Sequence, residues 1–175
     1  YRNHVYFYDA RLTSIDHYVA VLRNYYGFRG PVSRFEGSME DANGVVATSW
    51  PTAYGAYSAR SRGKRFYFVQ DFEPDFYAVS SDRILAENTY RMGFHAITAG
   101  PWLAQKLAAE VGMEADPFEF GCDTKSYFSR NEPRTGIAFY ARPCTPRRGY
   151  ELGLRALQLF AAKRPDIDIH LYGED

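Results

Sequence analysis

The chain has 175 residues, and its 21 basic and 21 acidic side chains leave no formal net charge at neutral pH. An apolar fraction of 46% indicates a folded globular protein and excludes an intrinsically disordered one. The charge balance gives no reason to expect a nucleic acid partner, so any anion-binding site has to be local. No apolar run approaches the roughly 18 residues of a membrane span, and no signal peptide is recognisable.

The two cysteines, Cys122 and Cys144, are too few for a disulfide framework and indicate a reducing compartment, which predicts a cytoplasmic protein. Neither lies at metal-ligand spacing from another cysteine or a histidine, and the four histidines are scattered, so no metal is expected. The chain starts at a tyrosine and stops at "HLYGED", which we interpret as a piece of a longer protein.

The N-terminal quarter of the chain gives the weakest pattern. Residues 4–10, "HVYFYDA", are typical of a strand. A helix is predicted over residues 13–27, because apolar side chains recur at helical spacing between a Thr13 or Ser14 cap and a terminal glycine. Residues 28–44 are rich in turn-forming residues and predict a loop.

A regular alternation of short apolar strands and helices follows. Strands are predicted at residues 44–50, 65–70, 94–98 and 117–120, and helices at residues 52–61, 80–93 and 100–112. Strands that alternate with helices in this way predict an α/β fold, with a parallel sheet flanked by helices.

The pattern divides the chain into two Rossmann-like lobes. Residues 1–121 form the N-terminal lobe, and the polar, turn-rich residues 122–135 form a linker. Residues 136–175 then contain only a strand, a helix and a second strand. So short a segment cannot bury a stable core alone, so we interpret it as the beginning of a truncated C-terminal lobe.

Three arginines gather where the first strand of the second lobe turns into its helix, in "YARPCTPRRGYE". Arg142 leaves the strand and Arg148 lies six residues later, at the helix start. Guanidinium groups match phosphate oxygens, and the unpaired N–H groups of a helix start favour an anion, so the turn predicts a pyrophosphate site. The alternative is a solvated loop near Glu151, and Arg147 fits that interpretation best.

This segment, "GIAFYARPCTPRRGYELGLRALQLFAAKRPDIDIHLYG", resembles the opening of the C-terminal domain of family 4 retaining glycosyltransferases of the GT-B fold. Arg142 falls on the arginine of the family motif and Arg148 on its lysine, and Ala141 stands where the family has glycine. "GCDTKSYF" resembles the interdomain segment. "ATSWPTAY", "YFVQDFEPDFY" and "ITAGPWLAQKL" resemble the bacterial rhamnosyltransferase branch, so the resemblance covers about residues 44–175.

The resemblance implies a two-lobed GT-B enzyme that transfers a sugar from a nucleotide diphosphate to a growing polysaccharide or lipid-linked glycan, with retention of configuration. The expected donor is a nucleotide sugar such as dTDP-rhamnose, held at its diphosphate by Arg142 and Arg148, without a metal or other cofactor. The family's E-x7-E motif would lie beyond residue 175, so this chain alone is expected to be inactive.

The acceptor side is predicted at the strand ends of the first lobe. Asp71 and Glu73 follow a strand in "VQDFEPDFY" and would orient an acceptor hydroxyl or take its proton, although the same residues are ordinary turn formers. Thr48 and Trp50 follow another strand in "ATSWPTAY". Trp50 would stack on a sugar or, alternatively, pack against its own helix.

Other interpretations stay open. The basic residues 59–65 suggest peripheral association with an anionic membrane at its cytoplasmic face, or else an exposed helix end. An open sheet edge suggests self-association. The chain could also come from a nucleotide-sugar epimerase or a sugar phosphorylase of GT-B fold, or be a non-catalytic fragment that binds a sugar nucleotide or a glycan.

Overall fold

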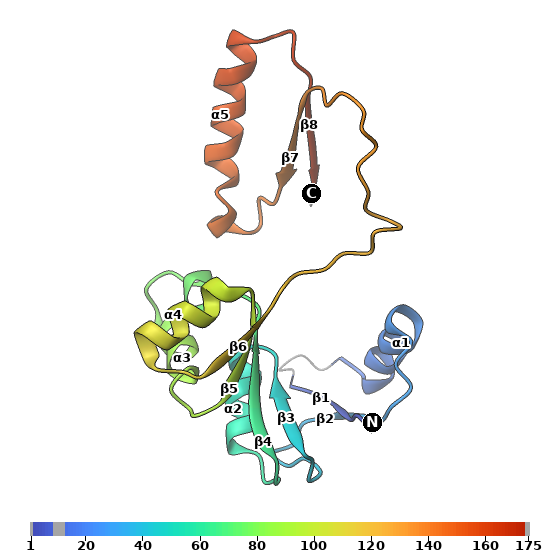
Figure 1. Ribbon diagram of the computed structural model, residues 1–175, viewed down its shortest axis with the longest axis vertical. Helices are drawn as coiled ribbons and strands as arrows, with labels where there is room; N and C mark the ends of the chain where they lie inside the picture. Colours follow the sequence, from blue (N-terminus) through green and yellow to red (C-terminus); the bar gives the residue numbers. More distant parts are fainter. Residues whose placement is uncertain (1, 9–12, 174–175) are drawn as a thin grey trace. The chain divides into compact units, whose positions relative to one another are not determined.

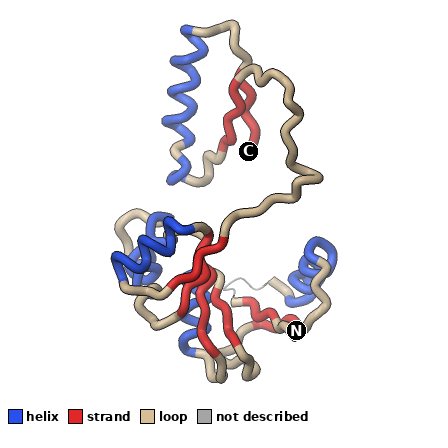
Figure 2. Tube along the Cα trace, viewed as in Figure 1, coloured by secondary structure: helices blue, strands red, loops and turns tan. Residues whose placement is uncertain are grey.

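The computed structural model describes residues 2–8 and 13–173, which divide into two compact units, residues 1–120 and 121–175. Each unit pairs parallel strands with connecting helices (Figures 1 and 2). The predicted α/β class, with parallel sheets flanked by helices, is therefore confirmed. None of the helices in the described ranges is both long and apolar enough to cross a bilayer.

A four-stranded parallel sheet forms the centre of the first unit. Its strands lie in sequence order, β3 (Gly44–Ala47), β4 (Lys64–Val69), β5 (His95–Ala99) and β6 (Ala115–Phe118). Their connections contain the helices α2 (Trp50–Ser58), α3 (Ser81–Thr89) and α4 (Pro101–Val111). Because right-handed crossovers that advance in one direction place their helices on one face, this sheet has a covered face and a more open face.

The core lies on the covered face. Strand residues of alternating positions, among them Val45, Tyr67 and Ala96, are buried there and cluster with Leu103 and Leu107 of α4. Alternation of buried and exposed positions is the pattern expected for a sheet with one packed face.

The opposite face of this sheet carries apolar side chains that are only partly buried. Val46 is 52% exposed, and Phe66 and Phe68 are half-buried. The rings of Phe68 and Phe118 stack at a centroid distance of 5.5 Å. This open face keeps aromatic surface in contact with solvent.

The last strand of this sheet begins two residues before the predicted one, over Ala115–Phe118 rather than 117–120. Its start is set by pairing with β5, in which Ala96 lies opposite Ala115. Pro117 is tolerated because β6 is an edge strand. The apolar run in the sequence marked the strand but not its register.

The remaining strands of this unit, β1 (Val5–Phe7) and β2 (Val32–Arg34), form a separate parallel pair connected by α1 (Ile15–Tyr26). The predicted helix is confirmed, and Ser14 is its cap, with its hydroxyl accepting a hydrogen bond from the backbone of the first turn at 3.3 Å. The predicted loop over 28–44 is wrong in part, because β2 lies within it. Residues 9–10 of the predicted first strand lie outside the described residues.

The second unit contains β7 (Ile137–Ala141), α5 (Tyr150–Lys163) and β8 (Ile169–Gly173), with β7 and β8 parallel. No described residue of 121–173 is fully buried. A strand pair with one helix buries too little apolar surface for independent stability, so this unit depends on further packing.

Candidate functional site

The connections that follow the central parallel strands meet at one end of the sheet. Thr48 directly follows β3, Asp71 lies two residues after β4, and Gly100 directly follows β5. In open parallel sheets this end is where ligands bind. The sequence prediction had placed its acceptor-side residues in these connections.

Glu73 links two of these strand ends. Its carboxylate accepts a hydrogen bond from the backbone N–H of Trp50 at 2.8 Å and another from the Tyr67 hydroxyl at 2.9 Å. Its own backbone N–H donates to the Tyr90 hydroxyl at 3.1 Å. Because Trp50 is the first residue of α2, Glu73 satisfies a helix donor that would otherwise have no intrahelical partner.

Among the described residues that are buried, Glu73 is the only charged one, with an exposure of 7%. Burial raises its pKa above the usual value, while the hydrogen bonds from Trp50 and Tyr67 oppose that shift. Both carboxylate oxygens are engaged, and the positive end of the α2 dipole lies beside them. We interpret Glu73 as a group that positions the strand-end loop; direct contact with an acceptor stays a prediction.

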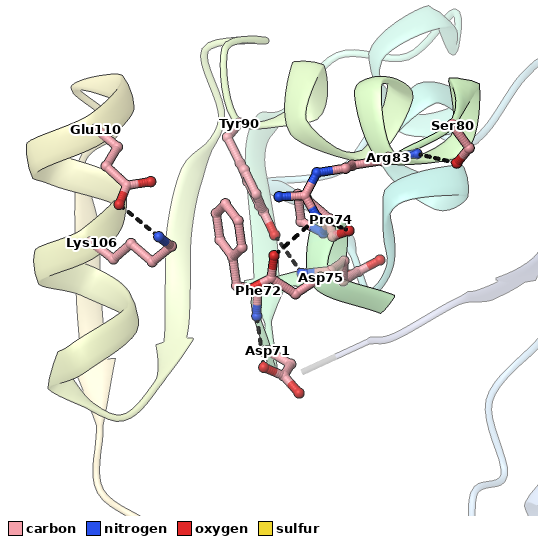
Figure 3. Close-up of polar contacts among 10 residues, drawn as sticks. Asp71, Phe72, Pro74, Asp75, Ser80, Arg83, Tyr90, Lys106 and Glu110 are labelled. Atoms are coloured by element: carbon pink, nitrogen blue, oxygen red, sulfur yellow. Dashed lines mark hydrogen bonds and ion pairs between the residues drawn. The ribbon is translucent and has the colours of Figure 1, made fainter. Parts of the chain in front are cut away.

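Asp71 has a different environment. It is solvent-exposed, and one carboxylate oxygen accepts a hydrogen bond from the backbone N–H of Phe72 at 2.8 Å. Figure 3 shows its side chain pointing away from the Arg83–Asp75 pair. Of the two predicted carboxylates, Asp71 is therefore the one that a ligand can reach.

Polar contacts fix the loop that runs from the end of β4 to α3. Arg83 forms an ion pair with Asp75 at 3.2 Å and donates to the Pro74 carbonyl at 3.1 Å (Figure 3). The Ser80 hydroxyl accepts from the Arg83 backbone N–H at 3.4 Å and caps α3. These contacts join the loop after β4 to the first turn of α3.

Trp50 lies half-buried at the start of α2, where its indole N–H donates to the Tyr77 hydroxyl at 2.9 Å. Tyr54 and Tyr77 both meet its ring edge-on at centroid distances of 6.2 Å. These contacts agree with the packing alternative, and stacking on a sugar stays a prediction. Thr48 is exposed, and its backbone N–H donates to the Thr52 hydroxyl at 2.9 Å.

A second tryptophan at this end of the sheet was not singled out from the sequence. Trp102 lies in the first turn of α4 and is 59% exposed. One helical turn on, the Lys106 ammonium lies 5.9 Å from the Trp102 ring and 4.2 Å from the Phe72 ring. The signal was available, since Trp50 and Trp102 each lie beside a proline, three residues after a strand.

The two predicted donor-binding arginines belong to the second unit. Arg142 follows β7, is half-buried, and places its guanidinium carbon 5.9 Å from the centre of the Tyr140 ring. Arg148 is exposed and ends a short 3-10 helix over Pro146–Arg148. It therefore lies two residues before α5 rather than at the helix start itself, because Gly149 adopts a left-handed conformation between the two helices.

The turn that carries these arginines is ordered by its backbone. The N–H of Thr145 donates to the carbonyl of Arg142 at 3.1 Å, and the N–H of Arg148 donates to the carbonyl of Thr145 at 2.9 Å. The turn thus keeps both arginines at the carboxyl end of β7, as the sequence predicted. Contact with a diphosphate remains a prediction.

Within residues 2–8 and 13–173, no three or more histidine, cysteine, aspartate or glutamate side chains form a group that could hold a metal ion. Both cysteines are exposed and free.

Two cavities of the first unit lie beside β1 and β2 rather than at the ends of the central strands. One has a volume of about 840 Å³ and is lined by residues that include His4, Tyr6, Ser33 and Glu36. The other has a volume of about 780 Å³ and is lined by residues that include Leu22 and Phe28. Neither was predicted, because the pattern in this part of the sequence is weak.

Comparison with known proteins gives two matches. Residues 32–99, which run from β2 to β5, match the family model "WsaF, N-terminal domain". Over 135 residues the chain is 39% identical to "O-antigen biosynthesis protein RfbC" of Myxococcus xanthus. That alignment covers 75% of this chain but 11% of the M. xanthus protein, so the chain spans a small part of this relative.

Proposed function

We propose that this chain is part of a glycosyltransferase that assembles a bacterial surface polysaccharide. The observation that carries the proposal is the 39% identity to an O-antigen biosynthesis protein over 75% of the chain. The match to the WsaF N-terminal domain model supports it independently, since that match includes the strand ends that carry Thr48 and Asp71.

The proposed reaction transfers a sugar from a nucleotide diphosphate, with dTDP-L-rhamnose as the proposed donor, to a hydroxyl group of a growing or lipid-linked glycan. The bond between the anomeric carbon and the diphosphate oxygen breaks, which releases the nucleoside diphosphate, and a bond from the anomeric carbon to the acceptor oxygen forms while the acceptor hydroxyl gives up its proton to the departing diphosphate. Retention of configuration and a GT-B arrangement of the intact enzyme belong to the same proposal.

Arg142 and Arg148 would stabilise the charge that develops on the leaving diphosphate. Arginine suits this role because its planar donor fork matches phosphate oxygens and stays protonated throughout. Electrostatic stabilisation of a leaving group is among the largest contributions that a protein makes to catalysis, so two cations at one turn are well placed to provide it.

In the first unit, Asp71 would orient the acceptor hydroxyl. Its exposed carboxylate can accept a hydrogen bond from that hydroxyl, whereas the buried carboxylate of Glu73 already has two donors. The residues Thr48, Trp50 and Trp102 would border the same acceptor region. Glu73 would act indirectly, by fixing the loop that carries Asp71.

Peripheral binding to the cytoplasmic face of an anionic membrane remains part of the proposal, although several cations in residues 59–65 have protein partners. Arg65 donates to the Ser61 carbonyl at 2.9 Å, and Arg62 lies 4.0 Å from the Asp41 carboxylate. Sedimentation with anionic vesicles would test this part of the proposal separately.

A binding module without chemistry of its own is the second candidate. It is favoured by the 11% coverage of the M. xanthus protein, since the reacting groups can then lie in the remainder of such a protein.

Calorimetry with dTDP-, UDP- and GDP-sugars tests the donor site. We expect one nucleotide class to bind, and both Arg142→Ala and Arg148→Ala to weaken binding at least about tenfold, because each removes a charge-assisted contact. Arg147→Ala is the matched control, since it removes an adjacent exposed arginine. Equal loss in all three variants would indicate non-specific attraction and contradict the assignment.

A further inference from the structure

A second site lies beside the first strand pair, apart from the row of residues at the ends of the central strands. We propose that the cavity of about 840 Å³ next to β1 and β2, here named the β1–β2 pocket, binds a neutral sugar residue of a glycan. This inference rests on the proposed function, because glycan assembly supplies such a ligand.

The pocket lies along the strand pair and extends past its carboxyl end. Half of its lining residues belong to the strands or precede β1, among them Tyr6 and Ser33, and half come after the strands, among them Ile15, Glu36 and Glu40. The carboxyl ends of parallel strands form ligand crevices, and the volume falls within the range of small-molecule sites.

One wall of the pocket is a fixed polar and aromatic surface. His4 directly precedes β1 and Tyr6 lies within it, and their rings stack at a centroid distance of 4.1 Å. The Tyr6 hydroxyl accepts a hydrogen bond from the backbone N–H of Glu40 at 3.0 Å, which ties the strand to the segment after β2. Rings with apolar faces and polar edges suit a sugar, whose C–H faces are apolar and whose rim is hydroxylated.

His4 lies between two polar neighbours in this wall. Its Nδ1 atom lies 3.4 Å from a carboxylate oxygen of Glu40, and its Nε2 atom shares a hydrogen bond of 2.9 Å with the Ser33 hydroxyl. Ser33 lies within the extended strand β2 and not on the sharp turn that presents a nucleophilic serine. We therefore interpret His4, Ser33 and Glu40 as structural parts of the pocket wall and not as catalytic groups.

The charges of the lining nearly balance, which favours a neutral ligand over a diphosphate. Arg34 opposes Glu36 and Glu40, and it also donates to the backbone carbonyl of Thr13. Glu36 is exposed and makes no hydrogen bond or ion pair with any residue in the described ranges. A carboxylate with open acceptor positions can take hydrogen bonds from two neighbouring sugar hydroxyls.

Saturation-transfer NMR of the full chain with the methyl glycosides of L-rhamnose, D-mannose and D-glucose tests the proposal. We expect at least one glycoside to receive magnetisation, and Glu36→Gln to weaken its apparent affinity about tenfold through loss of a charge-assisted acceptor. Ser38→Trp places a bulky side chain in the lining at an exposed position and should abolish the signal. Glu151→Gln, an exposed carboxylate of the other unit, is the control.

The possible outcomes are distinct. No signal with any glycoside, or equal signals in wild type and both pocket variants, would overturn the proposal. Displacement of the glycoside by dTDP in the Arg142→Ala variant would also overturn it, since it would show an anion in the pocket. If nucleotide binding depends on Arg142 and Arg148 but no glycoside gives a signal, the result would contradict this inference and would not contradict the proposed function.

Discussion

The carboxylate of Glu73 accepts a hydrogen bond from the backbone N–H of Trp50 at 2.8 Å, across 23 positions of sequence. This contact joins the loop after β4 to the first turn of α2. A buried carboxylate oxygen thus accepts a hydrogen bond from a backbone N–H at the start of the helix. The second oxygen of the same carboxylate accepts a hydrogen bond from the Tyr67 hydroxyl. One side chain therefore fixes the shape of the strand ends on which the acceptor proposal depends.

Replacing Glu73 tests this relationship. Glu73→Ala leaves the Trp50 N–H and the Tyr67 hydroxyl without their acceptor, and we expect the free energy of unfolding to fall by about 2–4 kcal/mol. Glu73→Gln keeps one acceptor oxygen and the side-chain volume, so its cost should be about 1 kcal/mol or less. Urea denaturation followed by circular dichroism measures both values, and equal losses in the two variants would contradict a hydrogen-bonding role.

The pH dependence of stability provides an independent test of the same group. Burial raises the folded-state pKa of Glu73 above its reference value of 4.5, so the folded state holds this proton more tightly than the unfolded state. The resulting stabilisation is complete below about pH 4.5 and is lost as the pH rises through the folded-state pKa.

We therefore expect the difference in unfolding free energy, wild type minus Glu73→Gln, to decrease as the pH rises from about 4.5 and then to level off. Other carboxyl groups cancel in this difference because both proteins contain them. A difference that grows with pH would show instead that the hydrogen bonds from Trp50 and Tyr67 outweigh desolvation.

The elements with strong local signals were predictable from the sequence. Helix α4 is predicted over 100–112 and lies at Pro101–Val111. Both of its ends have local sequence signals, a proline in the first turn and Gly112, which adopts a left-handed conformation, directly after the last turn. The three-residue strand β2 was missed, since Val32–Arg34 is defined by pairing with β1 and not by a pattern of its own.

The sequence predicted where the candidate site residues lie along the chain, but not the environment of their side chains. The sequence placed Asp71 and Glu73 after a strand but gave no indication that one is exposed and the other buried. The contacts of the buried Glu73 depend on the folded chain, since it accepts from Tyr67 in the preceding strand and from Trp50, 23 positions away. The β1–β2 pocket was missed for the same reason: the contact between His4 and Ser33 spans 29 positions.

A glycine between the linker and β7 tests the backbone of the second unit. Gly136 has a φ of +77°, and a Cβ atom there would lie 2.8 Å from the carbonyl oxygen of Asp168. Gly136→Ala should therefore destabilise the β7–β8 pair by at least about 1 kcal/mol, through strain and a close contact. Hydrogen exchange of residues 137–141 should accelerate, whereas Gly121→Ala, which meets no atom within 4 Å, should leave it unchanged.

Asp71 provides the sharpest test of the acceptor assignment, because its side chain is exposed and its substitution should not disturb the fold. Asp71→Asn keeps an oxygen that can accept from the Phe72 N–H but removes the negative charge, so we expect unchanged stability. In the intact enzyme, sugar transfer should fall at least about tenfold while nucleotide binding is retained, since general base or orienting groups contribute about that much or more. Asp82→Asn is the matched control, because Asp82 is an exposed carboxylate of the same unit that lies in α3 and not in the loop that carries Asp71. Equal transfer rates for both variants and wild type would remove Asp71 from the reaction, and a loss of nucleotide binding would place its role on the donor side instead.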